Sequence, residues 1–160
     1  VASAYLNKHT QTRFVVFGTG TMLQECRRRI ASMGLENRIF LPGATSEIGF
    51  FMNKADVLLH LAGTEGLPNV LIEAHLSGVP LLATPAGGTS EILEDGVSGL
   101  LLSCAHNVPV EEVTEKLSRL LSNPEMMQNM GAAGLKNAQR LFSIEFILDQ
   151  TVSLFGLDRT

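Results

Sequence analysis

Short apolar runs alternate with helix-like patterns through most of this chain, and that alternation limits the folds open to it. The runs occupy residues 13–17, 39–41, 57–61, 79–83 and 99–102, with helical patterns at 21–33, 46–54, 70–77 and 90–93. Strands and helices in this order build a parallel sheet. Because the runs are continuously apolar, both faces of the sheet should be covered. The sequence therefore predicts an α/β fold, a Rossmann-like parallel sheet sandwiched by helices.

Only helical patterns follow the last apolar run. They occupy residues 110–122, 124–141 and 143–155 and predict a helical C-terminal flank. Residues 1–8 resemble the end of a helix whose start is missing, and the chain opens on Val1. No repeat or linker pattern interrupts the chain. We therefore expect one domain over residues 1–160, truncated at its N-terminus.

The composition argues against several classes of protein. The 160 residues are 45% hydrophobic and 18% charged, with a net charge of −4, which disfavours disorder and nucleic-acid binding. No apolar stretch approaches the roughly 20 residues that span a bilayer, so we expect a soluble protein. The two cysteines, Cys26 and Cys104, suit a reducing, cytoplasmic compartment. Cys26 and Cys104 fit neither a metal pattern nor a disulfide framework. We expect both to be free thiols in the core.

Residues 63–74 leave one apolar run and enter a helical pattern, and they include two glutamates. Glu65 stands in the loop, and Glu73 stands eight positions later, one turn into the helix. Gly66 permits close approach of a ligand, and Pro68 opens a helix whose first amides point outward. Such amides favour a phosphate, and a nearby acid would accept hydrogen bonds from sugar hydroxyls. The pair also fits two solvated acids near a helix start, and the residues alone leave both interpretations open.

This stretch resembles the donor-site motif of retaining glycosyltransferases of the GT-B fold, family four, in which two glutamates separated by seven residues flank a Gly-x-Pro. Glu65, Gly66, Pro68 and Glu73 match that motif. The resemblance extends over residues 18–20, 55–57, 78–80, 83–84, 87–88, 91–92 and 95–101, and so covers nearly the whole chain. It implies one half of a GT-B fold, the nucleotide-sugar-binding C-terminal domain, without the N-terminal acceptor domain.

The resemblance implies a role for each matching residue. Glu65 would be the catalytic residue of this half and would bind hydroxyls of the transferred sugar. Glu73 would bind the ribose hydroxyls of a nucleoside diphosphate. The sugar and the distal phosphate would be held by the segment formed by Gly66, Leu67, Pro68 and Asn69.

Two further loops match the family by position. Gly43, Ala44 and Thr45 match the loop that lies against the nucleobase. Gly18 and Gly20 would lie near the phosphates, and both also fit a tight strand-to-helix turn with no ligand.

The function that the resemblance implies is retaining transfer of a hexosyl group. The donor would be a UDP- or GDP-linked sugar, and the acceptor a glycan, lipid or polysaccharide precursor held by the absent domain. Most members need no metal, and no other cofactor is implied. Members also carry an arginine and a lysine ahead of the position where this chain begins, so the chain by itself should be inactive. The full-length enzyme would associate peripherally with the inner face of a membrane. The alternative is a GT-B-like domain that binds a nucleotide or sugar without catalysing transfer.

Other patterns carry less information. The segment 18–20 lacks the third glycine of a dinucleotide-binding fingerprint. His60 lies inside an apolar run and His75 on a helical pattern, and neither has a helical partner with metal-ligand spacing. We expect two ordinary hydrogen-bonded or solvated histidines and no metal site. Helical spacing predicts that three methionines fill the core: Met126, Met127 and Met130.

Overall fold

The computed structural model describes residues 1–156. Two compact units make up the chain, Val1–Ile48 and the part that begins at Gly49, and each is described by itself. Every strand and helix that the sequence predicts is observed, in the predicted order. None of the helices in the described part combines the length and the apolar character that a membrane crossing needs.

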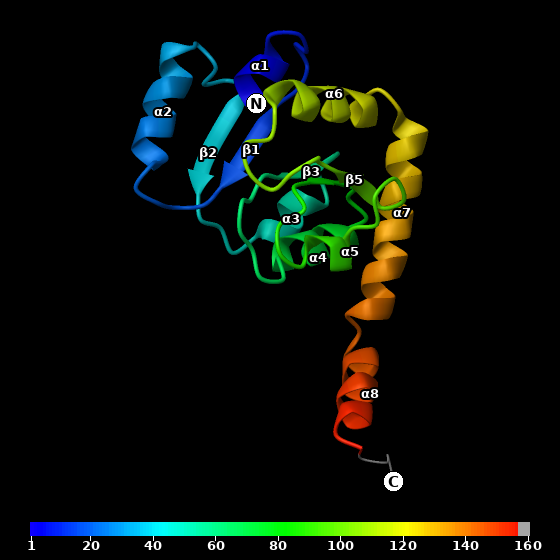
Figure 1. Ribbon diagram of the computed structural model, residues 1–160. Helices are drawn as coiled ribbons and strands as arrows, with labels where there is room; N and C mark the ends of the chain where they lie inside the picture. Colours follow the sequence, from blue (N-terminus) through cyan, green and yellow to red (C-terminus); the bar gives the residue numbers. More distant parts are fainter. Residues whose placement is uncertain (157–160) are drawn as a thin grey trace. The chain divides into compact units, whose positions relative to one another are not determined.

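Unit 1 is built around a parallel pair of strands. Its elements are α1 (Ala2–Leu6), β1 (Phe14–Phe17), α2 (Leu23–Ser32) and β2 (Ile39–Gly43). β1 pairs with β2, and α2 packs beside β2 (Figure 1). A register shift after Val15 places Phe17 opposite Gly43. The second strand therefore runs two residues beyond the predicted range 39–41 and takes in Gly43.

The β1 strand is less buried than its apolar sequence predicts. Val15 is 46% exposed and Val16 is 52% exposed, whereas Phe14 and Phe17 are half-buried. Phe14 meets the buried Tyr5 of α1 edge-on, with ring centroids 6.2 Å apart. Within its own unit, a two-stranded sheet has only α1 and α2 to pack against, and these do not cover both faces of β1.

Unit 2 holds a three-stranded parallel sheet in the order β3-β4-β5. α3 (Ile48–Met52) spans the division between the units. The later elements are β3 (Leu58–His60), α4 (Asn69–Leu76), β4 (Leu81–Ala83), α5 (Thr89–Ile92), β5 (Gly99–Leu101), α6 (Val110–Leu121), α7 (Pro124–Leu141) and α8 (Ile144–Leu154). The parallel strands and flanking helices agree with the predicted α/β class, although the strands form two sheets, one in each unit.

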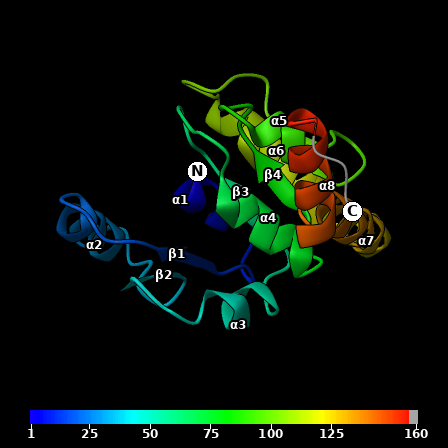
Figure 2. The same cartoon turned by 90° about the horizontal axis from the view of Figure 1, so that it is seen from below.

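The core of unit 2 lies around its central strand. All three residues of β4 are 0% exposed, because it is paired on both edges and α4 packs on it (Figure 2). The buried positions of α6 recur at intervals of four and three residues, which is the spacing of one helical face: Val113, Leu117 and Leu120.

The helix α7 approaches α4 closely through two glycines. A Cβ on Gly131 would lie 2.1 Å from the carbonyl oxygen of Gly78, and one on Gly134 would lie 2.4 Å from Cδ2 of His75. His75 is fully buried, and its Nε2 donates to the Ser98 carbonyl at 3.2 Å. Its Nδ1 has no partner among the described residues. Burial lowers the pKa of His75, and the bond to Ser98 offsets this in part.

The two cysteines are free but do not lie in the core. Cys26 is exposed on α2, and Cys104 is half-buried. The prediction of core thiols was wrong because α2 buries none of its side chains. Of the three methionines at helical spacing, Met130 is buried and the other two are half-buried.

Candidate functional site

The loop between β3 and α4, residues 61–68, contains Glu65 and is held from the neighbouring loop. The hydroxyl of Thr84, just after β4, donates to the Ala62 carbonyl at 2.6 Å. The amide of Gly88 donates to the Gly66 carbonyl at 2.7 Å. Because the carboxyl ends of parallel strands lie at one edge of their sheet, the β3–α4 loop and the loop after β4 meet there.

Two glycines make this close contact between the loops possible. Gly87 has a left-handed φ of +51°, and a Cβ on it would lie 2.1 Å from the carbonyl oxygen of Glu65. A Cβ on Gly88 would lie 2.8 Å from the Leu67 side chain. Both glycines therefore have a reason inside the chain to lack a side chain.

Gly66 has no such reason. Its φ lies outside the left-handed region, and a Cβ built on it would meet nothing within 4 Å. The space beside its backbone is open.

The Glu65 side chain is half-buried beside His60, the last residue of β3. Its Oε1 lies 3.1 Å from His60 Nε2, and the two side chains are 30% and 18% exposed. The prediction that His60 is an ordinary hydrogen-bonded histidine is confirmed, but its partner was not foreseen. The available signal was a polar residue in an apolar run, five positions before Glu65.

The N-terminus of α4 lacks the usual devices that satisfy a helix start. Pro68 occupies the N-cap position, no side chain caps the helix, and the first turn contains no acidic residue. Glu73 lies one turn into the helix, as predicted, and its side chain is exposed. The open amides and the helix dipole favour an anion at this end of α4.

The other predicted residues of this segment surround that helix start. Pro68 is buried, which fixes the direction in which α4 begins. Leu67 is 45% exposed, and Gly66 and Asn69 are also exposed.

The predicted residues of unit 1 lie after its two strands. Gly18 has a φ of +135° and donates its amide to the carbonyl of Gly43, whose φ is +93°, at 2.9 Å. The Thr45 hydroxyl accepts from the Glu47 amide at 3.0 Å. Gly20 is exposed, and its carbonyl accepts from the Leu23 amide as α2 begins. The structure thus joins Gly18 to Gly43 within this unit.

The loop after β5 is closed by a side chain of α6. Glu112 accepts from the hydroxyl of Ser103 at 2.6 Å, from its amide at 2.9 Å and from Lys116 at 2.9 Å. The Ser103 hydroxyl, followed by Lys116, lowers the pKa of Glu112. A Cβ on Gly63 would lie 2.6 Å from two ring atoms of His106, a later residue of this loop. The loop after β5 therefore also borders the β3–α4 loop.

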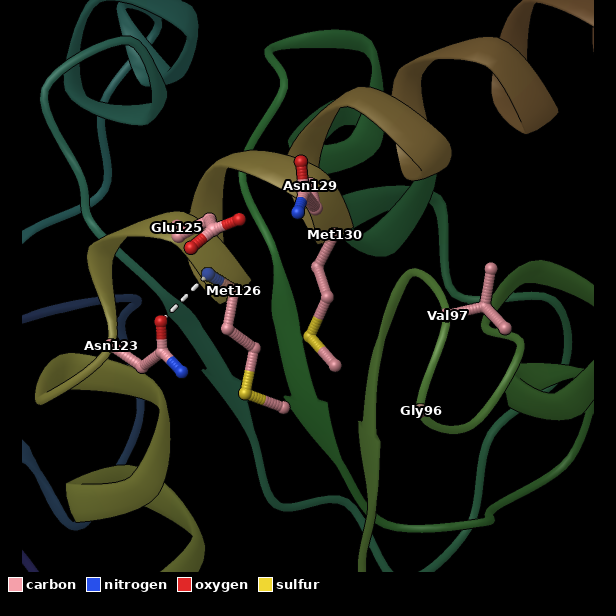
Figure 3. A pocket seen from close by; sticks show the side chains of 7 residues that line it. All are labelled: Gly96, Val97, Asn123, Glu125, Met126, Asn129 and Met130. Carbon is pink, nitrogen blue, oxygen red and sulfur yellow. Dashed lines mark hydrogen bonds between the residues drawn. The ribbon is translucent and has the colours of Figure 1, made fainter.

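A separate hollow of about 340 Å³ lies at the start of α7 (Figure 3). It is lined by Gly96, Val97, Asn123, Glu125, Met126, Asn129 and Met130, none of which is a predicted site residue. Within the described residues, no group of three His, Cys, Asp or Glu side chains is placed to hold a metal ion.

Comparison with known proteins gives a matching family and several relatives. The model of the family described as "Glycosyl transferases group 1" matches residues 2–137. The Vi polysaccharide biosynthesis protein VipC/TviE of Salmonella typhi is 39% identical over 121 residues, which are 76% of this chain and 21% of that protein. The poly(ribitol-phosphate) alpha-N-acetylglucosaminyltransferase of Staphylococcus aureus is 26% identical over 157 residues, which are 98% of this chain and 31% of that protein.

A solved structure has the same fold. The Anabaena Alr3699/HepE structure in complex with UDP matches with a TM-score of 0.85 at 23% identity, over 97% of this chain and 44% of that one. This likeness confirms the predicted α/β fold of one half of a GT-B glycosyltransferase. The chain spans only about a fifth to a third of the two curated relatives. Because the family description matches most of its length, this chain belongs to the glycosyl transferases group 1 family.

Proposed function

We propose that this chain is the donor-binding domain of a retaining glycosyltransferase. It binds a nucleoside diphosphate sugar for transfer of a hexosyl group to a glycan, lipid or polysaccharide precursor. The relatives support this reading, because one is named for polysaccharide biosynthesis and another for α-N-acetylglucosaminyl transfer.

The observation that carries the proposal is the start of α4. Among the helices of eight or more residues in the described part of unit 2, α6, α7 and α8 have an acidic residue in the first turn, and α7 and α8 also have a side-chain cap. α4 has neither. A diphosphate bound there would accept hydrogen bonds from the open amides and interact favourably with the helix dipole.

Each acidic residue then has a separate partner on the donor. Glu73, exposed on α4, binds the ribose hydroxyls. Glu65, at the carboxyl end of β3, binds hydroxyls of the transferred sugar. Gly66, Leu67 and Asn69 line the path between them, and the open space beside Gly66 admits the sugar. As the bond to the sugar breaks, the helix start stabilises the charge that develops on the departing diphosphate.

The remaining assignments concern the complete protein. From the resemblance to the family, we assign Gly18 and Gly20 to the phosphates and the segment with Gly43 and Thr45 to a uracil or guanine base. A second domain supplies the acceptor site and a basic pair for the diphosphate. The whole enzyme works at the cytoplasmic face of a membrane.

The test separates the two glutamates by role in the complete protein. Glu73→Ala should lower the affinity for UDP or GDP, whichever binds, by roughly 10- to 150-fold, because charge-assisted hydrogen bonds are worth about 1.5–3 kcal/mol. Glu65→Ala should leave the affinity for the bare nucleotide unchanged and lower the turnover of the sugar nucleotide. Calorimetry and transfer kinetics measure the two effects.

The matched control is Glu125→Ala, which removes an exposed acid from the first turn of α7. It should change neither measurement. If Glu65→Ala lowered the affinity for the bare nucleotide as much as Glu73→Ala does, the assignment of Glu65 to the sugar would be wrong.

A further inference from the structure

The backbone around Glu65 is fixed on both sides. The Thr84 hydroxyl holds the carbonyl of Ala62, and the Gly88 amide holds the carbonyl of Gly66, at 2.6 and 2.7 Å. These backbone contacts do not orient the Glu65 side chain. A glutamate has three rotatable bonds, so holding its carboxylate in one orientation costs conformational entropy.

His60 supplies a rigid support for that carboxylate. It ends β3 in register with Ala83, and its carbonyl accepts from the Thr84 amide at 3.1 Å, so its backbone belongs to the sheet. Its Nε2 lies 3.1 Å from Glu65 Oε1. An ionised carboxylate can only accept hydrogen bonds, so Nε2 carries the proton and donates.

The contact uses one oxygen of the carboxylate and leaves the other available. Within residues 1–156, Glu65 Oε2 has no hydrogen-bond partner, and the side chain is 30% exposed. An anchored carboxylate with one open oxygen is suited to accept from hydroxyls of a ligand in the adjacent space.

We propose that His60 is a positioning residue for the transferred sugar: its Nε2–H holds Oε1 of Glu65 so that Oε2 faces the sugar hydroxyls. This rests on the proposed function, in which Glu65 binds the sugar. His60 itself does not touch the substrate. Its contribution is the orientation of Glu65, because a carboxylate free to rotate meets the sugar less often in the productive geometry.

The test compares two changes at position 60 that differ in where they place a donor. In His60→Gln, the side-chain amide nitrogen reaches the place of Nε2, whereas the shorter side chain of His60→Asn reaches only the place of Nδ1. The complete protein is titrated with UDP and GDP and with panels of UDP- and GDP-hexoses. The measured quantity is the ratio of affinities between the sugar nucleotide and the bare nucleotide.

We expect His60→Asn to lower this ratio by about 3- to 10-fold, the usual worth of a net hydrogen bond, and His60→Gln to stay within about twofold of the wild type. Neither should alter the affinity for the bare nucleotide. Both keep a polar side chain at this half-buried position, and thermal unfolding checks that each variant is folded.

A double variant decides whether His60 acts through Glu65. In a Glu65→Ala background, His60→Asn should have no further effect on the ratio. A full effect in that background, an equal loss of bare-nucleotide binding, or equal behaviour of the Gln and Asn variants would overturn the proposal.

The same experiment separates this proposal from the proposed function. If Glu65→Ala lowers the ratio and His60→Asn does not, His60 has no positioning role and the donor site stands. If Glu65→Ala leaves the ratio unchanged, or no hexose raises affinity above that of the bare nucleotide, the assignment of Glu65 to the sugar falls and this proposal falls with it.

Discussion

The helices α4 and α7 pack against each other, yet they begin in opposite ways. The Asn123 side chain caps α7 by accepting from the Met126 amide at 3.0 Å, and Glu125 adds a negative charge to its first turn. α4 begins at Pro68 with neither device. The start of α7 thus has a cap and a negative charge from its own chain, whereas the start of α4 is open to an anionic ligand.

The glycines near the two helices differ in the same sense. The space beside Gly131 and Gly134 of α7 is occupied by other atoms of the chain, and a Cβ on either glycine would overlap those atoms. Gly66, just ahead of α4, faces open space. An absent side chain can therefore serve packing in one place and an approaching molecule in another.

The largest effect should come from adding a methyl group at these glycines. Gly134→Ala should destabilise the protein by about 1–3 kcal/mol, because the new Cβ overlaps the His75 ring. Gly66→Ala should leave stability almost unchanged and weaken binding of the sugar nucleotide. Urea unfolding and calorimetry measure the two quantities.

Equal stability losses in the Gly134→Ala and Gly66→Ala variants would break the comparison between them. So would unimpaired donor binding by Gly66→Ala, because the open space would then have no role for a ligand.

The next effect is a loss of stability in weak acid, from the contact between His75 and α7. Burial lowers the pKa of His75 in the folded protein, whereas the unfolded chain has the ordinary value near 6.5. The stability that neutral, buried His75 contributes is complete above pH 6.5. It is lost as the pH falls from there toward the pKa of His75 in the folded protein, because the unfolded state binds a proton that the folded state does not. The slope reaches at most about 1.4 kcal/mol per pH unit.

The pH effect is checked by urea unfolding between pH 7.5 and 5, compared with His75→Gln, which does not titrate. The two proteins differ only at position 75, so the difference between the two curves isolates the contribution of His75. Parallel curves would show that His75 carries the same charge in the folded and unfolded states.

The smallest effect should come from one substitution made at both helix starts. Asn69→Asp adds a negative charge to the first turn of α4 and should weaken the nucleoside diphosphate by about fivefold, or roughly 1 kcal/mol. Asn123→Asp makes the same change at the cap of α7. It should leave nucleotide binding unchanged, because the start of α7 lies outside the proposed donor site, and it should keep the helix intact, because aspartate is also a good cap. Calorimetry with UDP and GDP measures both, and an equal change in the two variants would mean that charge acts on the site from a distance.

Much of the fold and part of the site followed from local patterns. The strand and helix order, the open start of α4 at Pro68 and the position of Glu73 one turn into that helix were all predictable. These features depend on residues close in sequence, whose spacing and backbone preferences can be read directly.

Other features depended on partners distant in sequence. The exposure of Val15 and Cys26 reflects how few elements unit 1 offers its sheet. The extension of β2 to Gly43 follows from its pairing with Phe17. No pattern within either segment specifies these partners.

Local patterns were enough to specify the element order and the Glu65-to-Glu73 motif, and through them the family. Contacts between residues distant in sequence determine which oxygen of Glu65 is held by His60 and why Gly134 must lack a side chain beside the buried His75. Periodicity reports which face of an element is apolar. Which atoms meet across that face depends on the register of strands and the approach of helices, and these are set by packing of the whole unit.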